Sequence, residues 1–300
     1  MLLGFLPGIK NLQYHLMKTS LKRLMMAVLF LPVVAEGNPE RELTLVGLLL
    51  DLDADKGLVL EDGNHVGSWA NQVKGTKASL FVKRDEGRAK KGSGRPVLRK
   101  AVKELNGQSA LVFRQGELVS MGEDVFDGLT TGKGFTWFCV LAVHEQRVGL
   151  KDVNSFFGNL RNGGKYEGLW ANVRDDNTLW TGGRNGLTFG RFDQNNSEIL
   201  GPVLEKERFH LIASRMGAGT GKQTIELFVN GTKPVTTAAF PVRAEGNPSR
   251  MVVGQERDAI EHPGKESFDG EIARLLIFER PLDDAELELV MDLLKKRYGL

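Results

Sequence analysis

Residues 268–283 read FDGEIARLLIFERPLD, and this stretch decides the fold. Gly270–Phe278 is a mostly apolar run whose length is typical of a strand. Directly after it, Asp283 and Glu286 have the three-residue spacing of a helix capping box, in which each side chain accepts a hydrogen bond from the backbone N–H of the other residue. The stretch therefore predicts a strand that leads directly into a C-terminal helix.

The pattern after Asp283 supports this helix. Apolar residues follow one another at helical spacings of three and four, which predicts one buried stripe: Leu287, Val290, Met291, Leu294 and Tyr298. Lys295–Arg297 would place cations in the last turn, where the helix dipole favours them, and Gly299 can end the helix. We expect the stripe to pack on the rest of the domain, so the helix is interpreted as structural.

Upstream of the helix, the sequence favours many short strands. The chain has 300 residues with 36 Gly and only 10 Pro, which suits tight turns between strands. Phe135–Val143 is almost entirely apolar and is predicted to be a central strand covered on both faces. Ile225–Val229, followed by Asn230-Gly231, predicts a hairpin with a type I′ turn. The expected strands are 43–52, 66–72, 78–82, 109–113, 135–144, 155–160, 166–172, 209–215, 225–229, 251–254 and 270–278.

These features predict a single all-β domain over residues 40–300, closed by one α-helix. Residues 83–104 are rich in Lys, Arg and Gly and are expected to form an exposed loop. A nucleic-acid arm is the alternative for this loop, but it lacks the interleaved aromatic residues that stack on bases.

The N-terminus has the order of a secretory signal. Residues 17–23 are basic, Leu24–Val34 is an apolar run of eleven residues, and Val33-Val34-Ala35 offers a cleavage site. We expect residues 1–35 to be a signal peptide with an upstream extension, the true start being Met17; a longer leader and a buried core helix are the alternatives. The apolar run is too short for a stable membrane span, so a secreted, periplasmic or cell-surface location is predicted.

Charge and cysteine usage narrow the function classes. Residues 1–35 hold four basic and no acidic residues, so the remainder carries 36 basic and 38 acidic ones. This near balance predicts no nucleic-acid partner. Cys139 is the only cysteine, which excludes an internal disulfide and, in an exported protein, favours a bacterial origin.

At this point the sequence resembles a known group of domains. Residues 268–283 and 294–300 resemble the final strand and terminal helix of bacterial laminin-G-like domains, which belong to the concanavalin A-like lectin and glucanase superfamily. Residues 49–54, 66–71, 105–113 and 134–136 are similar to their opening and middle strands. The resemblance covers about residues 43–300 and implies a jelly-roll β-sandwich. It implies no single activity, because this fold serves sugar binding, adhesion, glycoside hydrolysis and lyase chemistry.

The sequence offers little catalytic chemistry. The Glu-x-Asp-x-x-Glu strand that glycosidases of this superfamily share is absent. Asp51, Asp53 and Asp55 alternate and would share one face of a strand, where a structural or solvated role is favoured. A calcium site of the laminin-G type is a further hypothesis, with Asp53 and Asp269 as its ligands.

The richest polar and aromatic stretch is Asn154–Asn196. Sugar sites stack a pyranose ring on an aromatic face and bind its hydroxyl groups with amide, carboxylate and guanidinium groups. The candidate glycan-binding residues are Trp170, Asn172, Asp175, Trp180 and Arg184. The alternative is that Trp170 and Trp180 are core residues, which is the commoner role of tryptophan in a jelly roll.

The leading hypothesis is an exported, non-catalytic domain that binds a carbohydrate or glycoconjugate. The alternatives are a glycoside hydrolase or polysaccharide lyase on the same fold, and a structural adhesion module. A groove with two close carboxylates and a Tyr, His or Arg would favour chemistry, whereas aromatic and amide groups alone would favour binding.

Overall fold

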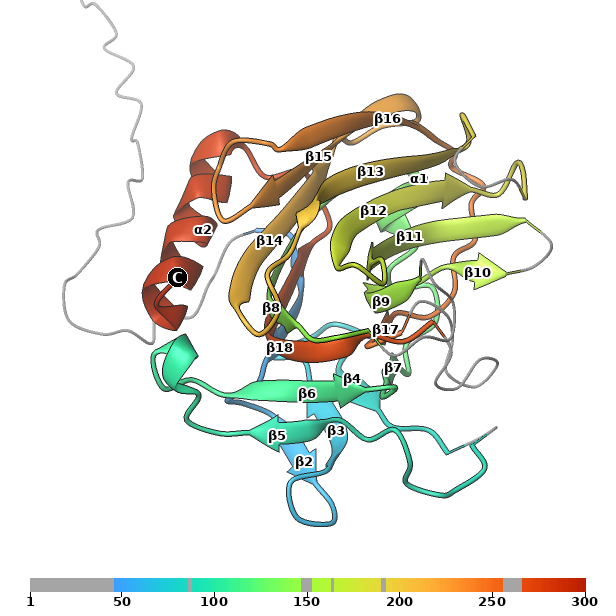
Figure 1. The fold of residues 1–300 in the computed structure, drawn as a ribbon. Helices are drawn as coiled ribbons and strands as arrows, with labels where there is room; N and C mark the ends of the chain where they lie inside the picture. Colours follow the sequence, from blue (N-terminus) through green and yellow to red (C-terminus); the bar gives the residue numbers. More distant parts are fainter. Residues whose placement is uncertain (1–45, 86–87, 147–152, 163–164, 190–192, 256–265) are drawn as a thin grey trace, which may run out of the picture. The chain divides into compact units, whose positions relative to one another are not determined.

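The structure is a computed structural model that describes residues 46–300, apart from 86–87, 147–152, 163–164, 190–192 and 256–265 (Figure 1). The predicted signal peptide, the proposed start at Met17 and the first residues of the predicted domain lie outside the described residues.

The described chain forms two antiparallel sheets that pack face to face (Figure 1). The sheet called A has eight strands, in the order β16-β15-β14-β8-β18-β6-β5, with β1 also paired to β18. Its strands are β1 (Leu48–Asp53), β5 (Val97–Arg99), β6 (Ala110–Arg114), β8 (Phe135–Val143), β14 (Phe209–Met216), β15 (Gly221–Val229), β16 (Thr236–Val242) and β18 (Asp269–Phe278).

The sheet called B has ten strands, in the order β13-β12-β11-β9-β17-β7-β4-β3-β2, with β10 paired to β11. Its strands are β2 (Leu58–Leu60), β3 (Val66–Ala70), β4 (Leu80–Val82), β7 (Leu118–Ser120), β9 (Asn154–Gly158), β10 (Arg161–Asn162), β11 (Tyr166–Val173), β12 (Thr178–Asn185), β13 (Asn196–Val203) and β17 (Val252–Val253). The predicted β-sandwich with a C-terminal helix is confirmed.

Two apolar cores lie on opposite faces of sheet A. The larger core fills the space between the sheets, where Trp137, Leu141 and Leu275 are buried. The smaller core lies between sheet A and the C-terminal helix α2 (Asp284–Tyr298), and it includes Phe138 and Val140. All nine residues of β8 are buried, because odd and even positions face different cores. The prediction of a central strand covered on both faces is confirmed.

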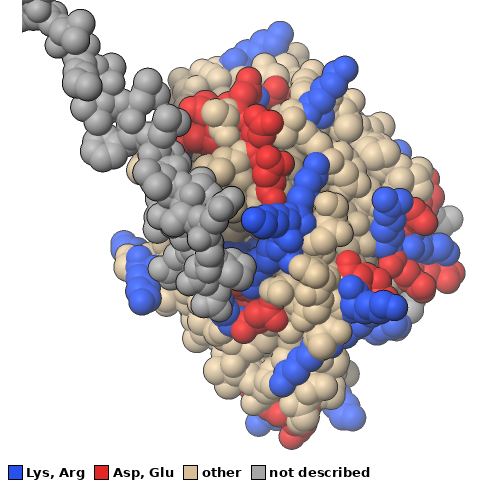
Figure 2. All heavy atoms as spheres, turned by 90° about the vertical axis from the view of Figure 1, so that its left-hand side faces the viewer, with Lys and Arg blue, Asp and Glu red and all other residues tan. Residues whose placement is uncertain are grey.

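The start and end of α2 follow the sequence pattern closely. The Asp283 carboxylate accepts a hydrogen bond from the backbone N–H of Glu286 at 2.8 Å, and the Glu286 carboxylate accepts one from the backbone N–H of Asp283 at 3.1 Å. Gly299 ends the helix with a φ of 70°, in the left-handed region. The five residues of the predicted stripe are buried, so this helix packs as expected. Figure 2 shows the side of the molecule that carries α2, where basic and acidic side chains are intermixed.

Some predictions of local structure were wrong. Residues 83–104 are not simply a loop, because they contain β5 and the start of a 3₁₀ turn, η1 (Lys103–Leu105). The β15–β16 hairpin exists, but residues 230–235 connect its strands, so the turn is longer than type I′. Asn230 instead uses its side-chain oxygen to accept a hydrogen bond from the backbone N–H of Leu211 at 2.8 Å. Among the described helices, α2 and the single turn α1 (Gly128–Thr131), neither is long and apolar enough to cross a membrane.

Candidate functional site

The predicted glycan-binding residues come together on the β11–β12 hairpin of sheet B. Leu169, Ala171 and Val173 of β11 point into the core between the sheets. The alternating residues Trp170 and Asn172 therefore lie on the other face of sheet B, called the outer face here. The register then places Gly182 opposite Trp170, Trp180 opposite Asn172, and Arg184 opposite Gly168 on this outer face.

Aromatic rings and arginine side chains stack along this face in a continuous row. Phe189 stacks on Tyr166 with ring centroids 4.8 Å apart and an interplanar angle of 23°. The Arg184 guanidinium lies 4.5 Å from the Tyr166 ring centroid and 5.0 Å from that of Trp170. Trp170 and Trp180 meet edge to face at 5.5 Å, and the guanidinium of Arg174 lies 5.9 Å from the Trp180 ring. We call this row the aromatic–arginine ladder: Phe189, Tyr166, Arg184, Trp170, Trp180 and Arg174.

Two adjacent glycines make room for aromatic rings on both faces of β12. A Cβ atom at Gly182 would lie 2.7 Å from the Trp170 ring, which real side-chain contacts do not show. A Cβ atom at Gly183 would lie 3.0 Å from the Phe240 ring on the opposite face. Glycine in a strand interior often marks such a close approach. The Gly182-Gly183 pair therefore allows both rings to lie flat against the sheet.

The inner part of the ladder is buried, and its aromatic end is open to solvent, while Arg174 at the other end is half-buried. Trp170 and Trp180 are each 1% exposed, and Arg184 is 4% exposed. Phe189 is 56% exposed, and Tyr166 is half-buried. A large ligand can therefore meet the ladder at the Tyr166–Phe189 stack, while the inner rings support that stack from below. An aromatic pair with one wet face is the kind of surface on which a sugar ring stacks.

Buried hydrogen-bond donors lie next to the inner rings. The Trp170 indole Nε1 and the Asn172 amide Nδ2 are buried and have no hydrogen-bond partner within the described part of the chain. The Asn172 side-chain oxygen accepts a hydrogen bond from the Ser155 hydroxyl, so the amide orientation is fixed. Unsatisfied buried donors are costly, and an acceptor such as a water molecule or a ligand hydroxyl would satisfy them.

The residues on either side of Phe189 are held by side-chain hydrogen bonds. The Asn185 side-chain oxygen accepts one from the backbone N–H of Leu187 at 3.1 Å. The Asp193 carboxylate accepts hydrogen bonds from the Thr188 hydroxyl at 2.7 Å and from the Asn195 N–H at 2.8 Å. These hydrogen bonds, that from Thr188 first, hold the pKa of Asp193 below its ordinary value. Leu187, Thr188 and Asn195 are therefore held by hydrogen bonds within the chain itself.

The structure thus brings four of the five predicted glycan-binding residues into one cluster, namely Trp170, Asn172, Trp180 and Arg184. Asp175 lies in the turn between β11 and β12, where it accepts a hydrogen bond from Asn154 Nδ2 at 3.2 Å. Whether these residues bind a glycan stays a prediction. Phe189 was not among the predicted site residues, because a phenylalanine between Thr188 and Gly190 gives no sign that it is exposed.

The predicted calcium ligands lie in different surroundings. Asp53 is fully buried, and its carboxylate is 2.8 Å from Arg274 Nη1 and 3.0 Å from Arg297 Nη2. Asp269 lies at the start of β18 and is also buried. In the part of the chain that the structure describes, no three His, Cys, Asp or Glu side chains are grouped so that they could hold a metal ion. Calcium binding by Asp53 and Asp269 stays a prediction, and calcium at Asp53 would have to displace two guanidinium groups.

Asp51 and Asp53 share one face of β1, as their alternation predicted, whereas Asp55 lies in the turn that follows the strand. Arg274 Nη2 donates to Asp51 at 2.7 Å, while Arg297 Nη2 lies 3.3 Å from Asp55. These contacts tie β1 to β18 and to the last turn of α2. The three carboxylates therefore have a structural role in the described fold.

Comparison with known proteins gives no family. No family model matches the chain, and no curated protein matches it. The solved structures that resemble it include "Ruminococcus gnavus IT-sialidase CBM40 bound to alpha2,3 sialyllactose", with 15% identity, a TM-score of 0.41, and coverage of 54% of this chain and 85% of that one.

Two further structures cover more of this chain. Trypanosoma rangeli sialidase in complex with sialic acid has 12% identity and a TM-score of 0.49, and the match covers 85% of this chain but 34% of the sialidase. The binding domain of botulinum neurotoxin DC in complex with SialylT has 11% identity and a TM-score of 0.44, with 83% of this chain and 52% of that chain covered. At these values, function has to be inferred from the chain's own residues.

Proposed function

We propose that this chain is an exported, non-catalytic carbohydrate-binding module whose ligand stacks on the Tyr166–Phe189 pair. The single observation that carries the proposal is the open end of the aromatic–arginine ladder. There, an aromatic side chain that is 56% exposed stacks on a second, half-buried ring. An exposed aromatic side chain costs free energy in water, and binding a sugar ring would offset that cost.

The chemistry next to the stack suits hydroxyl groups. Asn185, Thr188 and Asp193 supply amide, hydroxyl and carboxylate groups in the segment around Phe189. Sites for small ligands combine apolar contact area with a few placed polar groups of these kinds. The glycan is expected to cover Phe189 and to reach the polar groups of this segment.

The ladder favours binding over catalysis. Its six members are aromatic rings and guanidinium groups. The Tyr166 phenol is the one group among them that could transfer a proton or act as a nucleophile, and none of the six carries a carboxyl group. Glycoside hydrolysis on a pair of carboxylates would need such groups beside the stacked ring. We therefore keep the hydrolase and lyase as alternatives that product analysis decides.

The test is a glycan array probed with the chain from residue 36 onward and with four variants. Phe189→Ala and Tyr166→Ala remove stacking area, and we expect each to bind the hit glycan about threefold to tenfold more weakly. Tyr166→Phe retains the ring and should bind nearly as well as the wild type. Val235→Ala is the matched control, because Val235 is 49% exposed on the β15–β16 connection, away from the ladder.

Each outcome decides one part of the proposal. Full binding by Phe189→Ala and Tyr166→Ala would show that the site lies elsewhere, and binding to no glycan would overturn the function. Shortened or unsaturated products from the hit glycan would show that the chain is an enzyme. Repeating the array with a chelator tests whether glycan binding requires calcium, because a ligand held through calcium at Asp53 and Asp269 would be released.

A further inference from the structure

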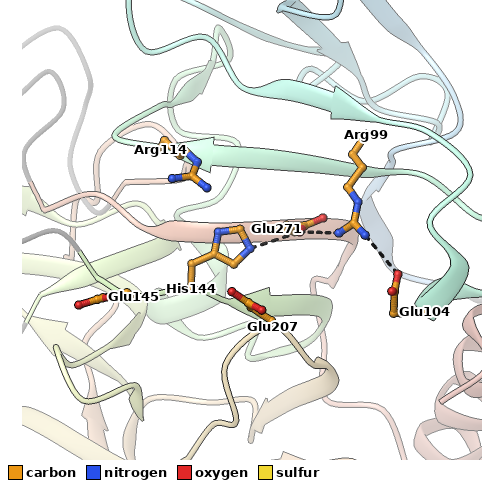
Figure 3. Close-up of a pocket in the computed structure, with 7 residues that line it drawn as sticks. All are labelled: Arg99, Glu104, Arg114, His144, Glu145, Glu207 and Glu271. Atoms are coloured by element: carbon orange, nitrogen blue, oxygen red, sulfur yellow. Dashed lines mark hydrogen bonds and ion pairs between the residues drawn. The ribbon is translucent and has the colours of Figure 1, made fainter.

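A pocket of about 470 Å³ lies on the α2 side of sheet A, away from the ladder. Four glutamates, Arg99, Arg114 and His144 line it, and we call it the charged pocket (Figure 3). The register explains this lining, because Arg99 lies opposite Ala110 and Glu271 lies opposite Ala142. Both alanines belong to the core beneath α2, so these charged side chains project from the same face of the sheet.

Part of the charge in this pocket is already paired. Arg99 Nη1 lies 2.7 Å from Glu271 Oε1, and its Nη2 lies 3.2 Å from Glu104. His144 Nε2 also contacts Glu271 Oε1, at 3.2 Å. Burial raises the pKa of Glu271, but the hydrogen bonds and charges of His144 and Arg99 outweigh it and hold this pKa below its ordinary value. Glu271 is therefore ionised at neutral pH.

Within the described part of the chain, the remaining charged groups of the pocket form no ion pair, and most of them are negative. Glu271 is 5% exposed, and its second oxygen, Oε2, is buried without a hydrogen-bond partner among the described residues. Glu207 is exposed and extends toward His144 in Figure 3. With four glutamates and two arginines, the lining carries a net charge of −2 when His144 is neutral. A positively charged ligand would gain free energy from this field.

The kind of cation follows from the geometry and the lining. Among the described residues, no three His, Cys, Asp or Glu side chains are placed to hold a metal ion, whereas an organic cation needs only hydrogen-bond acceptors. An ammonium group has three donors and no acceptor, so single carboxylates can accept its hydrogen bonds. The volume suits a small molecule, and the described lining holds no Trp, Tyr or Phe ring on which an uncharged sugar could stack.

We propose that the charged pocket binds a ligand with a primary ammonium group, attracted by the net negative lining and held by the exposed Glu207 carboxylate beside Glu271. The ammonium can come from an amino sugar or from a lysine side chain, and both present the same donors. The site is separate from the glycan site proposed on sheet B and does not depend on it.

The experiment follows the His144 ring signals by NMR while ligands are added to the chain from residue 36 onward. His144→Gln identifies these signals. Glucosamine is compared with N-acetylglucosamine, and Nα-acetyl-lysine amide with its Nζ-acetylated form. In each pair acetylation removes the positive charge and adds an acetyl group. Shifts with an uncapped amine and none with its acetylated partner support the proposal, and the pair that responds identifies the source.

Variants locate the contact. Glu207→Gln and Glu271→Gln should each weaken ammonium binding roughly tenfold, because each removes one negative charge from the lining and Glu207→Gln also loses a charge-assisted hydrogen bond. Glu205→Gln is the matched control, since Glu205 is an exposed glutamate two residues from Glu207 that does not line the pocket. Glu207→Gln is at the surface and should fold normally, so it keeps the test valid if Glu271→Gln does not fold.

Three results would overturn the proposal: equal shifts from charged and acetylated ligands, no shift with either amine, or wild-type affinity in Glu207→Gln and Glu271→Gln. Phe189→Ala should bind the ammonium ligands as the wild type does. Loss of glycan binding in that variant, with ammonium binding retained, would separate the two sites.

Discussion

Arg274 is the residue whose loss should destabilise this fold most clearly. Its guanidinium Nη2 donates to Asp51 at 2.7 Å, and Nη1 donates to Asp53 at 2.8 Å. All three side chains are buried, so Arg274→Met would leave two carboxylates inside the protein without their main partner. Breaking a buried ion pair in this way costs about 3–5 kcal/mol. We expect about 3 kcal/mol, the lower end, because Arg297 still lies 3.0 Å from Asp53.

The pH dependence of this loss gives a second check. Burial already raises the pKa of Asp51 in the wild type, and Arg274 opposes that shift. Without Arg274 the pKa of Asp51 should rise further, so the folded variant binds a proton that the unfolded chain, with its ordinary pKa of 3.8, releases. A carboxyl group whose pKa is raised in the folded state stabilises the fold at low pH, where it is protonated, and this stabilisation is lost as the pH rises through its pKa in the folded state. The deficit of the variant should therefore be larger at about pH 7 than at about pH 4.5.

The assay is guanidinium unfolding at both pH values. Arg208→Met is the control, because Arg208 and its partner Glu205 are each 66% exposed and such pairs contribute about 0–1 kcal/mol. Arg274→Lys keeps one charge but loses the forked geometry and should lie between the wild type and Arg274→Met. A loss below about 1 kcal/mol for Arg274→Met, or a deficit that grows at low pH, would refute this reasoning.

Three further predictions follow from the titratable groups. Burial, and then the charge of Asp124, raise the pKa of Asp127 to about 6. Asp127→Asn should therefore stabilise the protein by about 1 kcal/mol above pH 6, where the aspartate is ionised, and by progressively less below it. Thermal melts at several pH values measure this difference. Glu286→Ala removes the capping box and the Arg280 contacts at 2.6 and 2.7 Å, and urea unfolding should show a loss of about 1 kcal/mol. The pKa of Asp193 is lowered, so its carboxylate keeps the hydrogen bonds from Thr188 and Asn195 above pH 3.8 and loses them as the pH falls below that value. Glycan affinity, measured by calorimetry, should fall over the same pH range.

The ends of the chain show how much of the fold was predictable. Asp283, Glu286 and Gly299 fix α2 by local hydrogen bonds and backbone conformation, and local effects can be read from local sequence. The apolar run of β8, interrupted only by Thr136, predicted its burial for the same reason. Pairing between distant strands leaves no such mark. No local pattern showed that β18 would pair with β1, β6 and β8.

β12 shows why part of the site was missed. Its Gly182-Gly183 pair is typical of a turn, and the strand was not predicted for that reason. In the structure these glycines are needed inside a strand, because Trp170 and Phe240 occupy the space on its two faces. The residue types of the glycan site were recognised from composition, but their order along the ladder depends on the register of β11 with β12. Phe189 joins the ladder only through contact with Tyr166, which lies 23 positions earlier.

The outer faces of the two sheets are covered by different kinds of side chains, and this difference bears on function. On sheet A, α2 supplies an apolar cover, and the charged pocket is found on the same side. On sheet B, Arg184 lies over the Tyr166 and Trp170 rings and shields them with its planar, weakly hydrated guanidinium. Such a stack can bury its inner rings, but its last ring, Phe189, has no second ring partner among the described residues. The exposure of Phe189 follows from that geometry, and its removal should lower glycan affinity while leaving the two apolar cores intact.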